Sequence, residues 1–254
     1  MLLVAIGAVV VLLAGGLVWW LAAGGDDAEA CDAASTVDVT VAPALAPLAD
    51  EILSEPGALG DDGCLTARVT AQGPLQTAGA LSALDPESLP DVWLPDSSLW
   101  ALRAGDTELA DEGSLGSSPV VLATSQAAVE AAGWTDAPPT WAEALTTGQA
   151  VAVPDLTGST EGIAALTALR SSLGGDEDAD NAVVEVVLAA ARSGSAEQAL
   201  EAAGEGAQDA ALVPVSEQAV YAAHGGNADS SLVAVYPTEG SPVLDHPVFR
   251  VAPG

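Results

Sequence analysis

The sequence predicts an α/β protein with two lobes, preceded by a single N-terminal transmembrane helix. Three observations lead to this prediction. Short apolar strand patterns alternate with helix patterns of roughly 8–15 residues, which is typical of a mostly parallel sheet with helices on both faces. A turn-rich break at 133–139 separates two such series. An unbroken apolar stretch at 1–23 is long enough to span a bilayer.

The first series is expected to form lobe 1, at about 35–125, together with a returning C-terminal segment. Its strands are short runs rich in Val, Leu and Thr, and each is followed by an Ala- and Leu-rich helix pattern. The predicted strands are 37–41, 65–71, 92–94 and 118–124, and the predicted helices between and after them are 44–54, 75–84, 98–104 and 126–132.

The second series is expected to form lobe 2, at about 126–230, within one domain at 35–254. Thr140 and Glu143 have the spacing of a capping box and therefore mark a helix start. We expect the crossovers near 124 and 210 to act as hinges. The remaining predicted elements are strands at 151–153, 211–213 and 232–236, helices at 159–173, 182–192, 196–203 and 217–223, and an acidic loop at 174–180. The end at 248–254 has the pattern of a strand that leaves a domain.

The N-terminal stretch 1–23 is predicted to be a membrane anchor or an uncleaved signal, followed by a linker at 24–34. Trp19 and Trp20 close the apolar run, where an interfacial aromatic belt is expected. The alternative is a cleaved signal peptide, because Ala28-Glu29-Ala30 resembles a cleavage site. An anchored domain outside the cytoplasm is the expectation.

The two cysteines of the chain, Cys31 and Cys64, favour the same location. In an outward-facing domain, two cysteines indicate a disulfide. Closing this loop would stabilise the fold by about 3–4 kcal/mol in the chain-entropy model. The alternative is a pair of unrelated buried thiols.

Composition excludes several functions. The net charge is −31, with five Arg and no Lys, so nucleic acid and anionic lipid are not expected as partners. Without Lys there is no Walker A motif, no Schiff base to pyridoxal phosphate and no Ser-x-x-Lys nucleophile. The segment Gly158–Gly162 has Thr160 where a nucleophile elbow has Ser. We expect no enzyme and no cofactor.

Metal sites are also not expected. Only His224 and His246 are present, in separate segments, which excludes a His-rich metal site. Asp176, Asp178 and Asp180 have the spacing of a calcium loop, but Val187 occupies the position of the bidentate Glu. A solvated acidic loop that caps the next helix is the favoured interpretation.

The most informative stretch is 90–100, Pro-Asp-Val-Trp-Leu-Pro-Asp-Ser-Ser-Leu-Trp. A short buried strand runs into Ser97 and Ser98, which can cap a helix and offer donors to a ligand at the carboxyl edge of a sheet. This run resembles one in bacterial extracellular solute-binding proteins, especially the actinobacterial ones in which the domain precedes a von Willebrand A-like domain. The resemblance implies a two-lobed, type 2 periplasmic-binding-protein-like fold that closes over a small ligand, and an ABC-transporter permease as partner. In that family a strand like the one at 248–254 is usually followed by more protein, so the resemblance also implies a domain truncated at its C-terminus.

Further motifs occur in an order similar to that of molybdate-class binding proteins. They are 117–123, 154–159, 236–240 and 244–247. On that resemblance, the cleft-facing residues would be Ser117, Ser118, Thr157, Ser159 and Thr160. After the first strand the family's oxyanion site has a hydroxyl, whereas this chain has Ala42-Pro43. After the second strand the family has a Ser-Gly pair, and here Gln72-Gly73 stands instead. Gln72 therefore favours a neutral or differently shaped ligand.

Two functions follow from these features. A solute receptor should have a deep polar pocket where Gln72, Ser97, Ser118 and Ser159 converge. The alternative is an extracellular interaction or adhesion module with a protein partner, which keeps the fold but fills the cleft with apolar side chains.

Overall fold

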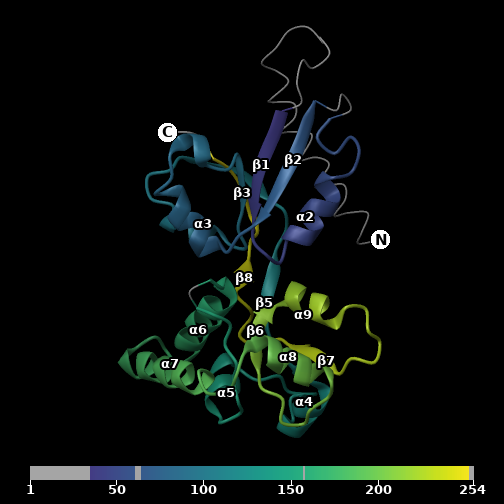
Figure 1. Cartoon of the computed structure of the whole chain (residues 1–254). Coiled ribbons are helices and arrows are strands. Elements are labelled where there is room, and N and C mark those ends of the chain that lie inside the picture. The colour runs from purple at the N-terminus through teal and green to yellow at the C-terminus, as the bar shows by residue number, and fades with distance from the viewer. Residues whose placement is uncertain (1–34, 61–63, 157, 252–254) are drawn as a thin grey trace. The chain divides into compact units, whose positions relative to one another are not determined.

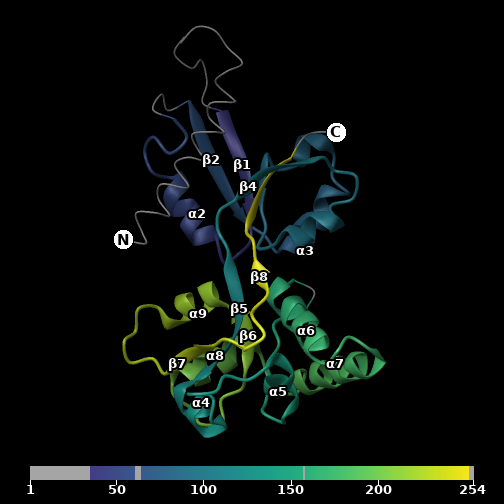
Figure 2. The same cartoon turned by 180° about the vertical axis from the view of Figure 1, so that it is seen from behind.

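A computed structural model describes residues 35–60, 64–156 and 158–251. The chain forms two compact units, shown in Figure 1. Unit 1 comprises residues up to Gly116 together with the segment from Asp245 onward, and unit 2 is the continuous stretch Ser117–Leu244. The chain therefore passes between the units twice, at 116–117 and at 244–245. Both passages can be followed in Figure 2, where β4 (Leu109–Ser114) and β8 (Val243–Leu244) are labelled.

Unit 1 contains a five-stranded sheet in the order β2-β1-β3-β9-β4. The strands β1 (Ser35–Val41), β2 (Leu65–Ala71) and β3 (Val92–Leu94) are parallel, and β9 (Pro247–Val251) runs antiparallel between β3 and β4 (Leu109–Ser114). The helices of this unit are α2 (Ala46–Leu53), α3 (Pro74–Leu81), and the short 3-10 helices η1 (Pro86–Ser88) and η2 (Ser98–Arg103).

The period-two alternation of the strands divides the core of unit 1 into two faces. Trp93 and Phe249 lie on the face covered by α3 and η2, with ring centroids 5.7 Å apart. Their strand neighbours Val92, Leu94 and Val248 lie on the opposite face, among the side chains that pack with α2. Burial on both faces explains why β3 is a continuous apolar run.

Unit 2 is built around the central strand β5 (Ser118–Ser125). β6 (Val213–Ser216), β7 (Leu232–Val235) and β8 (Val243–Leu244) all pair with it in antiparallel orientation. The helices are α4 (Gln126–Ala132), α5 (Trp141–Thr146), α6 (Thr160–Ser172), α7 (Glu177–Ala190), α8 (Ala196–Gly204) and α9 (Glu217–His224). Two apolar clusters fill the unit, one centred on Leu122 and Leu169 and the other on Val121 and Val213.

Several predictions differ from this architecture. The expected mostly parallel sheet is found for three strands of unit 1 only. The strand expected at 151–153 is a single bridge from Val151 to Leu212. The polar strand β4 was not predicted, because its sequence LADEGS is mostly exposed and lacks an apolar alternation. The acidic loop expected at 174–180 is shorter than predicted, because the Asp176 side chain caps α7 and the helix begins at Glu177.

The boundary between the units also differs from the expected lobes. The predicted lobe 1 contained 118–125, but β5 is the central strand of unit 2. The expected hinge near 124 and 210 lies inside unit 2, where the Thr124 hydroxyl donates to the Ala210 carbonyl at 3.2 Å in a buried position. The chain passes between the units at 116–117 and 244–245 instead.

The expected membrane helix 1–23, the linker 24–34 and Cys31 lie outside the described residues. Within the described ranges, no helix has the length and apolarity needed to cross a membrane. No cysteine there is free, and the Cys31–Cys64 bond stays a prediction.

Candidate functional site

The carboxyl edge of the unit 1 sheet is the first candidate. Because β1, β2 and β3 are parallel, the loops that follow them meet at one edge, where open α/β sheets bind ligands. Gln72 N–H donates to the Val41 carbonyl at 3.0 Å, and Ala42 N–H donates to Leu94 at 2.8 Å. His246 N–H reaches the Asp96 carbonyl at 3.3 Å, so the segment entering β9 joins the same edge.

Gln72 follows β2 and is half-buried at the start of α3. Its Oε1 accepts a hydrogen bond of 2.9 Å from the Thr77 hydroxyl. This bond fixes the carbonyl end of the amide, so its NH₂ group is the end suited to a solute. Helix α3 begins after Gly73 without a side-chain cap. Gln72 is therefore well placed to donate to a neutral acceptor.

Ser97 and Ser98 follow β3 and come together with Asp245. The buried Ser97 side chain caps η2 by accepting from Leu99 N–H at 3.3 Å. Ser98 N–H donates to Asp245 Oδ1 at 2.8 Å. The donors expected to hold a ligand at this loop thus already bind a carboxylate of the protein itself.

Asp245 is held ionised by these contacts. Burial, the largest single influence, raises the pKa of this carboxyl. The N–H and hydroxyl of Ser98, the N–H of Asp245 itself and the hydroxyl of Ser97 together outweigh burial and place the pKa below its ordinary value. A fixed negative charge therefore lies at this edge at neutral pH.

His246 also belongs to this edge. Its sequence context, Asp245-His246-Pro247, by itself indicates only a turn. Its side chain is 7% exposed and its φ is +38°, in the left-handed region. Within the described residues, neither ring nitrogen has a hydrogen-bond partner. Burial lowers the pKa of the imidazole, against the opposing influence of Asp96 and Asp245.

The second candidate is the pair of helix starts in unit 2. The buried Ser118 side chain accepts from Gln218 N–H at 3.0 Å, in the first turn of α9. Ser216 caps the same helix, and its own N–H donates to Glu161 Oε1 at 2.6 Å. Because Glu161 lies in the first turn of α6, the starts of α6 and α9 are joined by a carboxylate.

The predicted site residues fall into two groups, one in each unit. Gln72, Ser97 and Ser98 come together at the edge of unit 1. Ser159 caps α6, accepting from Gly162 N–H at 3.4 Å, and Thr160 is buried beside Glu161. Ser117 is exposed. Thr157 lies outside the described residues. Asp245, His246 and Glu161 were not chosen as site residues from the sequence, although 244–247 was among the motifs, since their partners are distant along the chain.

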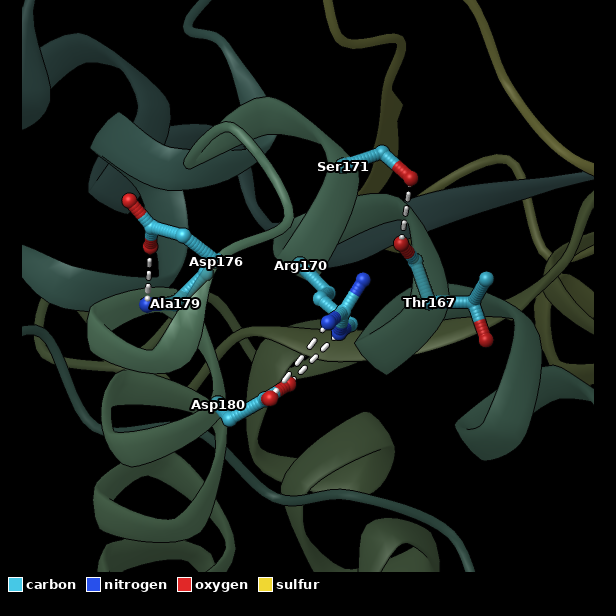
Figure 3. Close-up of polar contacts among 6 residues, drawn as sticks. All are labelled: Thr167, Arg170, Ser171, Asp176, Ala179 and Asp180. Carbon is cyan, nitrogen blue, oxygen red and sulfur yellow. Dashed lines mark hydrogen bonds and ion pairs between the residues drawn. The ribbon is translucent and has the colours of Figure 1, made fainter.

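The acidic segment after α6 has structural contacts rather than a calcium geometry (Figure 3). Asp176 Oδ1 accepts from Ala179 N–H at 3.0 Å and caps α7. Asp180 accepts from Arg170 Nε at 2.5 Å, and both side chains are exposed. This bond is the largest influence that lowers the pKa of Asp180. Across the described ranges, no group of three or more His, Cys, Asp and Glu side chains could hold a metal ion.

Comparison with solved structures shows the same fold in binding proteins. A periplasmic thiamin binding protein matches with a TM-score of 0.64 and 15% identity, covering 91% of this chain and 77% of that chain. Iron-bound HitA from Pseudomonas aeruginosa matches at 0.62 and 15%, covering 86% and 76%. The sulfate-binding protein SubI from Mycobacterium tuberculosis H37Rv matches at 0.56 and 13%, covering 87% and 77%.

Curated protein sequences contain no match to this chain. The family model described as bacterial extracellular solute-binding protein matches residues 36–253, which include both units and every loop of the candidate site. The chain belongs to the family of bacterial extracellular solute-binding proteins.

Proposed function

We propose that this protein is a solute receptor that binds a neutral or cationic small molecule. The binding groups would come from the carboxyl edge of the unit 1 sheet, with the Gln72 side chain as a donor. The observation that carries this proposal is the Asp245 carboxylate, which occupies the Ser98 N–H at 2.8 Å. Glu161 occupies Ser216 N–H in the same way.

The charge at the two loops disfavours an oxyanion. An anion placed about 4 Å from one of these carboxylates would be repelled by about 1–4 kcal/mol, depending on solvent exposure. It would also lack charge-assisted hydrogen bonds worth about 1.5–3 kcal/mol each, because the donors are already engaged. The net charge of −31 adds a long-range attraction for cations.

A thermal-shift panel on the soluble part of the chain, from Asp26 onward, tests this proposal. The panel would contain thiamin and choline, maltose, neutral amino acids, sulfate, molybdate and calcium. A true ligand at a hundred times its dissociation constant adds about 2.7 kcal/mol of stability. Stabilisation by a neutral or cationic compound is expected, whereas stabilisation by sulfate or molybdate would contradict the ligand class.

A matched pair of variants tests the site once a compound binds. Gln72→Ala removes the proposed donor at the carboxyl edge and should abolish or strongly weaken the shift. Gln76→Ala changes an exposed Gln in the first turn of α3 and should leave the shift unchanged. Equal shifts in both variants would place the solute elsewhere.

We infer that the receptor is anchored by residues 1–23 with its domain outside the cytoplasm. The family and the Cys31–Cys64 pair support this location. Closure over the solute would use the passages at 116–117 and 244–245 as hinges, and an ABC-transporter permease would be the partner. Membrane fractionation of the full chain tests the anchor. Protease added to intact cells tests whether the domain lies outside the cytoplasm.

The alternative function is an extracellular interaction or adhesion module. Leu99 and Leu102 on η2 favour it, since they are 51% and 85% exposed beside the candidate loop. Apolar side chains exposed together are typical of protein contact surfaces. No stabilisation by any compound of the panel would favour this alternative.

A further inference from the structure

His246 lies directly after the passage of the chain from unit 2 into unit 1. Leu244 is buried in the core of unit 2 and pairs with Ser118. Two residues later, the backbone of His246 is fixed in unit 1 on both sides: its N–H donates to Asp96 at 3.3 Å, and its carbonyl accepts from Leu115 N–H at 3.0 Å. These contacts hold a φ of +38°, which is uncommon for a residue other than Gly.

The imidazole is buried without a hydrogen bond. Both Nδ1 and Nε2 are inaccessible and lack partners within the described part of the chain. A neutral ring leaves one buried donor unsatisfied, whereas a protonated ring would leave two donors and a charge. Protonation in this position is therefore costly, and the charged ring gains by moving toward solvent or a carboxylate.

The charged groups on the neighbouring elements are few. Asp245 on its own segment and Asp96 after β3 act on the ring, but Asp245 already accepts from Ser98 N–H and Asp96 from Trp100 Nε1 at 2.7 Å. On β4, Asp111 accepts from Gly113 N–H, and Glu112 pairs with Arg250 of β9 at 2.9 Å. A charged ring would have to compete with these existing donors for the carboxylate oxygens.

The other passage is tied to the same segment. The Ser114 hydroxyl contacts the carbonyls of both Gly116 and Asp245, and Gly116 N–H donates back to Ser114 Oγ at 3.1 Å. One hydroxyl thus connects the ends of both passages on the unit 1 side. Displacement of the 245–246 backbone would disturb both passages together.

We propose that His246 is an acid-sensitive latch on the two passages between the units. The neutral, buried ring keeps the segment 245–246 bonded to Leu115, Ser114 and Asp96. On acidification the ring gains a proton, leaves its buried position and loosens these bonds. This mechanism requires no solute, so it stands or falls independently of the proposed function.

NMR titration of the full chain in detergent from about pH 7.5 to about pH 5 tests the latch. Only two imidazoles are present, so the His224→Asn variant assigns their signals. The His246 ring is expected to titrate below about 6.5, the ordinary value for His. The amide signals of Leu115 and Ser98 should shift with the same midpoint.

Variants separate the latch from general acid effects. His246→Asn removes the titration while retaining a side chain that tolerates the left-handed region, and should abolish the shifts of Leu115 and Ser98. His224→Asn should leave them unchanged, and Asp96→Asn should move the His246 midpoint further down. A His246 midpoint at or above about 6.5, or amide shifts that do not follow it, overturns the proposal. The wild-type titration decides the outcome even where His246→Asn does not fold.

Discussion

Side chains of this protein satisfy its own helix starts at the loops where a ligand was expected. Ser97 and Ser118 accept from backbone N–H groups, and carboxylates reach Ser98 and Ser216. A hydroxyl or carboxylate at a helix start satisfies donors that would otherwise be unpaired. The Ser-rich loops therefore stabilise the fold through contacts within the protein. Among the residues predicted to bind a ligand, Gln72 has an NH₂ group that is suited to a solute.

Asp245→Asn should lower the free energy of unfolding by about 1–3 kcal/mol at neutral pH, because a charge-assisted acceptor of Ser98 N–H is lost. The folded-state pKa of Asp245 lies below its ordinary value. Its contribution is therefore present above that ordinary value and is lost as pH falls through the folded pKa. Urea unfolding at neutral and acidic pH measures both effects.

A control for this variant is Asp106→Asn, which changes an exposed carboxylate just beyond the end of η2. It should change the unfolding free energy by less than about 0.5 kcal/mol. Equal effects of the two substitutions would mean that Asp245 acts only through net charge.

At the scale of elements, the helix starts are where local sequence and tertiary structure meet. Helices α5 and α8 have complete capping boxes formed within four residues, and α5 was predicted from this pattern. The start of α9 differs, because Ser118 and Glu161 come from a strand and a helix far away in sequence. Its stability depends on the packing of unit 2.

Ser118→Ala should destabilise the start of α9 by about 1–2 kcal/mol, because Gln218 N–H loses its acceptor in a partly buried position. The neighbouring exposed residue gives a matched control: Ser117→Ala should change stability by less than about 0.5 kcal/mol. Chemical unfolding of both variants measures this difference. A larger effect at Ser117 than at Ser118 would contradict the assignment.

At the scale of the whole molecule, each unit has its own apolar core. Unit 2 is continuous in sequence, and its two ends lie side by side, because Ser118 pairs with Leu244. Unit 1 is assembled from two segments, with β9 returning between β3 and β4. The two units therefore differ in how they can be separated from the chain.

The fragment 117–244 should fold on its own and unfold cooperatively, because both of its apolar clusters are formed by its own residues. Circular dichroism during thermal unfolding measures this. A fragment that ends before β9 should not form unit 1, since Phe249 and Val251 are missing from its core. A disordered 117–244 fragment would show that unit 2 needs unit 1 to fold.

Reduction should lower the melting temperature of the protein, because the predicted Cys31–Cys64 bond would contribute about 3–4 kcal/mol. The measurement compares melting curves with and without a reductant, and a Cys64→Ser variant is the control that should no longer respond. An unchanged melting temperature on reduction would mean that the bond is absent.

Short-range sequence patterns predicted many of the secondary-structure elements and the family of this protein. Apolar strands, the Thr140 capping box and the helix from Thr160 to Ser172 follow from short-range patterns, and the run at 90–100 identified the family. These features depend on residues within one or two turns of each other. The same short range led to the choice of Gln72, Ser97 and Ser98 as candidate site residues, because each lies within a few residues of the end of a predicted strand.

Tertiary structure decided what distant residues do to one another. Asp245 meets Ser98 across 147 positions, Glu161 meets Ser216 across 55, and the direction of each strand beside β5 depends on where the chain returns. His246 is unremarkable in sequence, and only its burial and backbone contacts make it a candidate switch. Pairing, burial and charge at these positions arise from contacts between distant segments, which no local pattern encodes.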